Sequence, residues 1–270
     1  MKGVRKMKPD YKNWVPKGMV TGFWAGAAAL LLLFVLSAAT GFGLAQGALR
    51  TALSVVLFAG FAVCLGAGIW CAVAYRAFSY DGERKLSKSI VEGTADFVKL
   101  PKGGVGLDVG CGSGALTIAC AKRNPQGSMV GIDRWGKEYA SFSKKVCEQN
   151  AEAEGVRNVR FEKGDATKLA FPDETFDAVT SNYVYHNITG VDKQQLLLET
   201  LRVLKKGGTF AIHDIMSPAR YGDMDAFCEQ LRREGYEQVK LIRTTNGLFM
   251  NRSEARTLML TGSALLIGRK

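Results

Sequence analysis

Three glycines alternate with other residues in Asp108-Val109-Gly110-Cys111-Gly112-Ser113-Gly114, directly after a short apolar run. Glycine adopts backbone conformations that other residues avoid, and it lets a ligand approach the main chain closely. Such a loop between a strand and a helix commonly receives a pyrophosphate at the helix N-terminus. Here a carboxylate stands two positions ahead of the first glycine, which disfavours an anionic ligand. The loop therefore predicts a site for a cationic ligand.

Polar side chains that could do chemistry follow four later apolar runs. Acidic residues end two of them, an Asn-Tyr pair and a histidine follow the third, and the fourth ends in a second histidine; in order these residues are Asp133, Asp165, Asn182, Tyr183, His186 and His213. The carboxyl ends of parallel strands gather at one edge of a sheet, where ligands bind. We therefore expect these side chains to line one rim.

The elements that must position these residues follow from the hydrophobic pattern. Short apolar runs alternate with helical periodicity from residue 105 onward. Strands are expected at 105–110, 128–133, 159–165, 176–187, 208–215, 236–245 and 262–270, and helices at 115–124, 137–155, 193–208 and 223–235. Alternation of this kind indicates βαβ crossovers. The fold prediction is an α/β class, with a doubly wound, seven-stranded, mostly parallel sheet over residues 105–270.

Residues 76–104 are expected to form a polar connector that becomes an amphipathic helix. One face of that helix would carry Leu86, Ile90, Val91, Ala95 and Val98. The sequence thus divides into a basic N-terminus (1–19), an apolar region (20–75), the connector and the α/β domain.

The apolar region predicts a pair of membrane-spanning helices at 20–42 and 51–75. Arg50 is the only charged residue from Gly18 to Tyr75, and each run is long enough to cross a hydrocarbon core of about 30 Å. A cleaved signal peptide is the alternative, but the first run is long for one and a second span follows directly. Lysine and arginine flank the outer ends of the pair, so both termini and the α/β domain are expected in the cytoplasm.

The net charge of +11 does not indicate a nucleic-acid partner. Residues 1–19 carry six basic and one acidic side chain, whereas residues 90–270 carry 25 basic and 22 acidic ones. The excess therefore lies beside the predicted spans, where it suits anionic lipid headgroups. Six scattered cysteines without a C-x-x-C pair and only two histidines predict no metal site.

The stretch LDVGCGSG at 107–114, together with the pattern over residues 100–270, resembles the class I S-adenosylmethionine-dependent methyltransferases. The resemblance implies S-adenosylmethionine as cofactor, with the glycine loop carrying its methionine and ribose parts. Asp133 would hold the two ribose hydroxyls, and Asp165 would accept a hydrogen bond from the adenine amino group. The cofactor-binding residues implied in this way are Asp108, Gly110, Cys111, Gly112, Gly114, Asp133, Arg134, Asp165, Ala166, Asn182 and Tyr183. Either Arg134 or Trp135 would cover the adenine. A nicotinamide-binding protein is the alternative, and the absence of G-x-G-x-x-G disfavours it.

The acceptor side of the site is expected to use His186, Tyr185 and His213 as catalytic residues. Histidine takes up a proton near neutral pH, as an oxygen or sulfur nucleophile requires before it attacks a methyl group. The structural alternative is that both histidines fix loops by hydrogen bonds. Asp214 is as well suited to capping a turn as to contacting substrate.

The sequence-based hypothesis is a membrane-anchored methyltransferase acting on a small lipophilic acceptor, such as a quinone precursor. The family resembled includes quinone and sterol methyltransferases. Three alternatives stay open: a soluble acceptor with the anchor used for localisation, a cofactor-binding sensor or scaffold without catalysis, and, least favoured, a transporter. Gly22-x-x-x-Gly26 permits a homodimer through the apolar helices.

Overall fold

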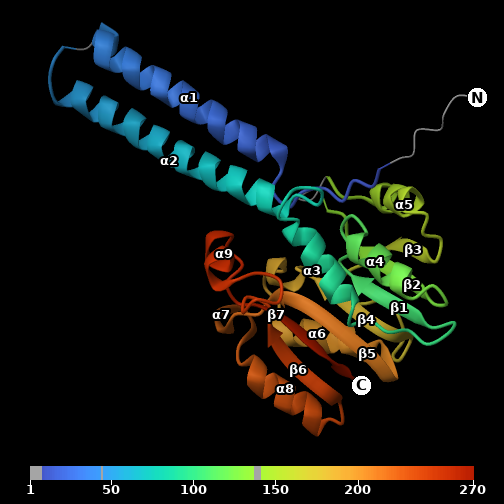
Figure 1. Cartoon of the computed structure of the whole chain (residues 1–270). Helices are drawn as coiled ribbons and strands as arrows, with labels where there is room; N and C mark the ends of the chain where they lie inside the picture. Colours follow the sequence, from blue (N-terminus) through green and yellow to red (C-terminus); the bar gives the residue numbers. More distant parts are fainter. Residues whose placement is uncertain (1–7, 44, 137–140) are drawn as a thin grey trace, which may run out of the picture. The chain divides into compact units, whose positions relative to one another are not determined.

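A computed structural model describes residues 8–43, 45–136 and 141–270 (Figure 1). The basic residues Lys2, Arg5 and Lys6 and the start of the predicted helix 137–155 lie outside the described residues. The chain divides into two compact units. One comprises Asn13–Ser87, and the other comprises Lys88–Lys270 together with residues 8–12. The division therefore joins a short N-terminal segment to the α/β domain.

The first unit is a helical hairpin of α1 (Lys17–Thr40) and α2 (Ala48–Phe78). The helix α1 ends where Gly41 adopts a positive φ of 65°, and the Arg50 guanidinium donates to the carbonyl oxygen of Ala38 at 2.7 Å. By length and composition both helices can cross a membrane. Within the most apolar 18-residue stretch of each helix, only 6% is buried. The predicted pair of long apolar helices is thus present, and the helices are exposed rather than part of a soluble core.

The connector forms α3 (Leu86–Ala95). All five residues predicted to share its apolar face are buried: Leu86, Ile90, Val91, Ala95 and Val98. The predicted amphipathic character is confirmed, although the helix ends before Val98.

The second unit is built on a seven-stranded sheet in the order β3-β2-β1-β4-β5-β7-β6. Its strands are β1 (Val105–Val109), β2 (Ser128–Asp133), β3 (Val159–Lys163), β4 (Phe176–Asn182), β5 (Leu204–Ile215), β6 (Glu237–Arg243) and β7 (Ser263–Arg269). The first five are parallel, whereas β7 runs antiparallel to both β5 and β6. The prediction of seven mostly parallel strands is confirmed.

Helices connect these strands and cover the sheet (Figure 1). They are α4 (Ala115–Arg123), α5 (Lys144–Ala153), α6 (Lys193–Arg202), α7 (Pro218–Tyr221), α8 (Met224–Arg233) and α9 (Arg252–Thr257). One buried cluster joins Leu107 and Val109 of β1 to α6 and α8, and a second joins the other side of the sheet to α3 and α4. Alternate residues of a strand face opposite sides, so Asp108 faces away from the first cluster, toward α4.

Two helices are shorter than their apolar patterns predict. The helix α6 ends at Arg202 rather than at the glycines 207–208, because Leu204 is fully buried and already pairs with Phe176 of β4. Burial in the sheet therefore overrides the glycine signal for a helix end. Within the described residues α5 begins at Lys144, where the Ser143 side chain accepts a hydrogen bond from the Val146 amide at 3.2 Å.

Candidate functional site

The glycine loop between β1 and α4 has a backbone that only glycine tolerates well. Gly110, Gly112 and Gly114 have φ values of 76°, 56° and 83°. A Cβ on Gly110 would lie 2.3 Å from a methyl carbon of Val184. The amides of Gly110 and Cys111 both donate to the carbonyl oxygen of Ile132, at 2.8 and 2.9 Å. The loop is therefore tied to the end of β2 and packed against the segment that follows β4.

Asp108 is the buried carboxylate beneath this loop. Its Oδ2 accepts a hydrogen bond from the Thr117 hydroxyl of α4 at 2.6 Å. Its Oδ1 is buried and has no hydrogen-bond partner among the described residues. Burial raises the pKa of Asp108 to about 7. An unpaired buried carboxylate oxygen favours a cationic group or a hydrogen-bond donor from a ligand, as the sequence predicted.

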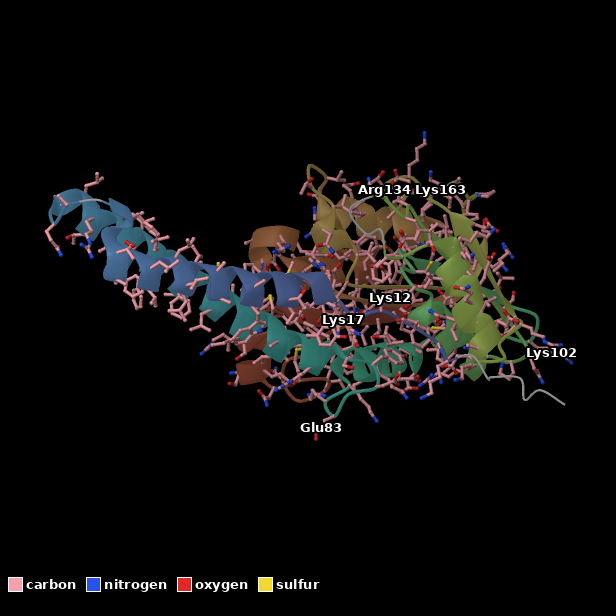
Figure 2. All side chains as sticks on the ribbon, turned by 90° about the horizontal axis from the view of Figure 1, so that it is seen from above. Lys12, Lys17, Glu83, Lys102, Arg134 and Lys163 are labelled. Carbon is pink, nitrogen blue, oxygen red and sulfur yellow. The ribbon has the colours of Figure 1, made fainter. Side chains whose placement is uncertain are left out.

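Asp133 ends β2 and braces the glycine loop from the other side. Its Oδ2 accepts from the Gly112 amide at 2.9 Å, and its Oδ1 accepts from the Trp135 amide at 2.7 Å. The Trp135 indole donates in turn to the Gly112 carbonyl oxygen at 3.0 Å. Arg134 points outward and is exposed, as is Lys163 at the end of the neighbouring strand (Figure 2). Asp133 is therefore held in a fixed orientation beside Gly112.

Asp165 follows β3 on the next loop and is exposed. Its Oδ1 accepts from the Thr167 amide and hydroxyl at 2.8 and 2.7 Å. These hydrogen bonds lower its pKa, so the carboxylate is ionised at neutral pH. Ala166 is half-buried against the core. The Asp165 carboxylate is therefore available to accept a hydrogen bond from a donor such as an exocyclic amine.

The segment after β4 carries strained and tightly bonded residues. Tyr183 adopts a φ of 56°, rare for a non-glycine residue. Its amide donates to the His213 carbonyl oxygen at 2.8 Å, and its hydroxyl hydrogen-bonds the Ser263 hydroxyl at 2.7 Å. Asn182 Oδ1 lies 2.8 Å from His213 Nδ1. Strain of this kind recurs at functional sites. The Tyr183 ring contacts both histidines, with ring centroids 5.9 Å from His186 and 4.6 Å from His213.

His186 and Asp214 form a hydrogen-bonded pair at this rim. Asp214 Oδ1 lies 2.5 Å from His186 Nδ1, while its Oδ2 accepts from the Tyr185 and His186 amides at 2.8 and 3.2 Å. Burial raises the pKa of Asp214, but the bonds from His186 and the Ile215 amide outweigh it and hold that pKa below its usual value. The ionised carboxylate fixes the proton on Nδ1 and leaves Nε2 as the proton-accepting nitrogen.

Two residues predicted to be catalytic are buried in this structure. Tyr185 is fully buried, and its hydroxyl hydrogen-bonds Thr200 of α6 at 2.6 Å. His213 is also fully buried, and its Nε2 hydrogen-bonds the Thr244 hydroxyl at 3.0 Å. Desolvation lowers the pKa of His213 to about 3, so the imidazole stays neutral. Tyr185 therefore lies in the core and His213 hydrogen-bonds Asn182, and the catalytic roles expected for both stay predictions.

Sequence reasoning missed the residues that the last two strands bring to the rim. Ser263 begins β7 and pairs with Ile215 at the end of β5, because β7 runs antiparallel. Phe249 packs edge-on against His213, with ring centroids 5.3 Å apart. A Cβ on Gly93 of α3 would lie 2.3 Å from the Phe249 ring. The one local signal for this contact was Gly93, a glycine within an amphipathic helix.

Comparisons with known proteins agree with this geometry. A family model described as a methyltransferase domain matches residues 100–251. The chain is 36% identical to the demethylmenaquinone methyltransferase of Lactobacillus johnsonii over 122 residues, 45% of this chain and 48% of that protein. It is 34% identical to the 2-phytyl-1,4-naphtoquinone methyltransferase of Thermosynechococcus vestitus over 124 residues, 46% and 51% of the two chains. The chain thus spans about half the length of these curated relatives.

Among solved structures, geranyl diphosphate methyltransferase in complex with GPP and sinefungin superposes with a TM-score of 0.53. The match covers 72% of this chain and 81% of that one at 15% sequence identity. Identity at this level supports the fold alone, which agrees with the strand order described above.

Proposed function

Because the chain belongs to the methyltransferase domain family, we propose that it is an S-adenosylmethionine-dependent methyltransferase with a membrane-embedded helical hairpin and a lipophilic acceptor. The observation that carries the cofactor assignment is the unpaired, buried Asp108 oxygen under a glycine loop that tolerates no side chain at Gly110. A cationic ligand that lies against the main chain fits such a loop.

The residues around the loop suit the remaining parts of this cofactor. The Asp133 carboxylate is held in place beside Gly112 and can accept hydrogen bonds from two neighbouring hydroxyls, as a ribose offers. The ionised Asp165 would accept from the adenine amino group. Asn182 and Tyr183, on the segment that packs against Gly110 through Val184, would lie beside the sulfonium. When bound, S-adenosylmethionine supplies a methyl group already activated for transfer.

The protein's own contribution to the reaction is placement and proton transfer. His186 Nε2 would take the proton of the acceptor as the acceptor's electron pair forms the new bond to the methyl carbon. The sulfur of the cofactor would keep the electron pair of the bond that breaks. Asp214 stabilises the imidazolium that results, as an acidic residue does in other Asp-His pairs. Tyr183, which is half-buried, and Phe249, which is buried, would exclude water from an aromatic acceptor.

The pH dependence of cofactor binding follows from Asp108. Its folded pKa of about 7 means that the carboxyl is protonated below neutrality, whereas a cationic ligand needs the carboxylate. We expect the Kd for S-adenosylmethionine to rise by about tenfold per pH unit below 7. Titration calorimetry from pH 5.5 to 8.5 measures this slope, and Asp108→Asn should flatten it while weakening binding at pH 8. A wild-type Kd that is independent of pH would contradict the role of Asp108.

The raised pKa of Asp108 also predicts how the stability of the cofactor-free protein depends on pH. The folded pKa of Asp108 lies above the ordinary value of 3.8, so between about pH 4 and 7 the folded state binds more protons than the unfolded state. The contribution of this group to stability therefore falls as pH rises through that window. Asp108→Asn should raise the Tm of the cofactor-free protein at pH 8 and leave it nearly unchanged at pH 4. Equal Tm differences at both pH values would contradict this account.

A lipophilic acceptor is supported by two independent features. Two of the relatives are named demethylmenaquinone methyltransferase and 2-phytyl-1,4-naphtoquinone methyltransferase, and this chain carries two exposed apolar helices. We propose that the hairpin anchors the enzyme where such an acceptor dissolves, with both termini and the catalytic unit on the cytoplasmic side. A homodimer through Gly22 and Gly26 of α1 remains a prediction.

The acceptor class can be tested without choosing an acceptor in advance. Detergent-purified full chain is incubated with S-adenosylmethionine labelled on its methyl group and an extract of cellular lipids and metabolites. Label in the organic phase is the expected result. Label confined to the aqueous phase would favour the alternative in which the anchor only localises the enzyme. Tight cofactor binding with no transfer to either phase would favour the sensor alternative.

A further inference from the structure

A short N-terminal segment lies on the catalytic unit, far in sequence from its partners. The Asp10 amide donates to Asn150 Oδ1 at 2.7 Å, and Asn150 Nδ2 donates to the Asp10 carbonyl oxygen at 3.1 Å. One side-chain amide on α5 therefore pairs with both main-chain groups of a residue 140 positions away. We call residues 10–11 the N-terminal strap.

The strap reaches the glycine loop directly. The Ser113 hydroxyl donates to the Tyr11 carbonyl oxygen at 2.8 Å, and Asn150 Nδ2 also donates to the Ser113 carbonyl oxygen at 3.0 Å. Ser113 stands between two of the positive-φ glycines, and both Ser113 and Asn150 are buried. Asn150 thus joins the strap and the glycine loop in one hydrogen-bonded cluster.

The side chain of Tyr11 fastens the other end of the strap. It is buried, and its hydroxyl donates to Glu154 at 3.2 Å. Glu154 also pairs with Lys122 of α4 at 2.8 Å. Residues 150 and 154 are one helical turn apart, so the strap follows α5 from its clasp at Asn150 to the helix end. Lys12, labelled in Figure 2, is half-buried, and its ammonium pairs with the Asp10 carboxylate at 2.5 Å.

A loop with three glycines in close succession has little intrinsic order, because glycine loses more conformational freedom on folding than other residues. Asp133 and Trp135 restrain it at Gly112 from the β2 side. The strap and Asn150 restrain it at Ser113 from the α5 side. A loop restrained on both sides loses less entropy when it binds a ligand, which raises affinity.

We propose that the N-terminal strap is a positioning element of the cofactor site, with Asn150 as its clasp. The inference rests on the proposed function of the glycine loop. The sequence predicts a basic N-terminus at residues 1–19 that suits anionic lipid headgroups, whereas the strap makes residues 10–11 part of the cofactor site. The same segment runs on within a few residues to the start of α1 at Lys17, so the chain that enters the hairpin also braces the loop.

Two substitutions at one position separate the strap's main chain from its side chain. Asp10→Pro removes the amide that donates to Asn150. Asp10→Ala keeps that amide and removes an exposed carboxylate that accepts from the Lys12 amide and pairs with the Lys12 ammonium. With full-length protein in detergent, calorimetry measures the Kd for S-adenosylhomocysteine. We expect Asp10→Pro to raise this Kd by about five- to thirtyfold, as the loss of one or two hydrogen bonds implies. Asp10→Ala should change it by less than about twofold.

Kinetics distinguish positioning from a general loss of structure. In Asp10→Pro the KM for S-adenosylmethionine should rise with the Kd while kcat at saturating cofactor stays at the wild-type value. If Asp10→Pro also lowers the Tm, Ser113→Ala serves as the second variant, because it removes the Ser113 hydroxyl bond to Tyr11 and leaves the strap's sequence intact. It should give a smaller rise in Kd at an unchanged Tm.

Equal Kd values for Asp10→Pro, Asp10→Ala, Ser113→Ala and wild type would overturn the role of the strap while leaving the proposed function in place. A wild-type chain that binds no S-adenosylhomocysteine would instead overturn the proposed function, and the strap's role with it.

Discussion

His186→Ala is expected to lower kcat for methyl transfer by about 10²- to 10⁴-fold, the usual contribution of a positioned general base. The Kd for S-adenosylhomocysteine should stay at the wild-type value, because His186 contacts Asp214 and not the glycine loop. Single-turnover kinetics at saturating cofactor measure this loss without interference from product release.

Two companion variants test the Asp-His pair itself. Asp214→Asn preserves the shape of the side chain but replaces one carboxylate oxygen by a donor, so His186 loses the acceptor that fixes its proton on Nδ1. A large loss of kcat is again expected. Asn187→Ala is the matched control: it alters an exposed neighbour whose own hydrogen bond is long, at 3.4 Å. Wild-type turnover in His186→Ala would contradict the catalytic role and favour the structural alternative, in which this histidine only fixes the loop.

Asp133→Ala is expected to weaken cofactor binding by about 1–3 kcal/mol, or about 5- to 150-fold in Kd. The variant removes the proposed acceptor of the ribose hydroxyls and also the support that Asp133 gives to the Gly112 amide. Calorimetric titration with S-adenosylhomocysteine measures the effect directly.

The Asp133 result needs a variant that separates its two roles. Asp133→Asn keeps an oxygen that can accept from Gly112 but exchanges the other oxygen for a donor. An intermediate Kd is therefore expected. Glu148→Ala, which removes an exposed carboxylate of α5, controls for the change in charge. An unaltered Kd in Asp133→Ala would refute the assignment of this residue to the cofactor.

The glycine loop and the acids at the strand ends were predictable because their signals are local. The positive φ values at Gly110, Gly112 and Gly114 favour glycine through local backbone sterics alone. A polar residue directly after a buried strand falls at the carboxyl edge of any parallel sheet. The alternation of strands and helices predicted which other segments end at the carboxyl edge of the sheet.

The burial of Tyr185 and His213 depends on packing that a single segment does not encode. Tyr185 stands in a short 3-10 turn, Tyr185–Asn187, where a difference of one position decides whether a side chain faces the core or the rim. His213 is covered because β7 returns antiparallel beside β5 and because Thr244, after β6, reaches its ring. The pairing of Asn150 with Asp10 spans 140 residues and leaves no periodic signal in either segment.

The central claim is that this chain transfers a methyl group to a lipophilic acceptor. The most direct measurement uses full-length protein in lipid bilayers that contain a reduced naphthoquinone with an isoprenoid tail and an unsubstituted ring position. S-adenosylmethionine labelled on its methyl group is added, and labelled lipid and S-adenosylhomocysteine are quantified in the same samples. The account predicts equal molar amounts of the two products, both strongly reduced in His186→Ala. Wild-type protein that binds the cofactor but forms neither product, with this acceptor or with the lipid extract, would contradict it.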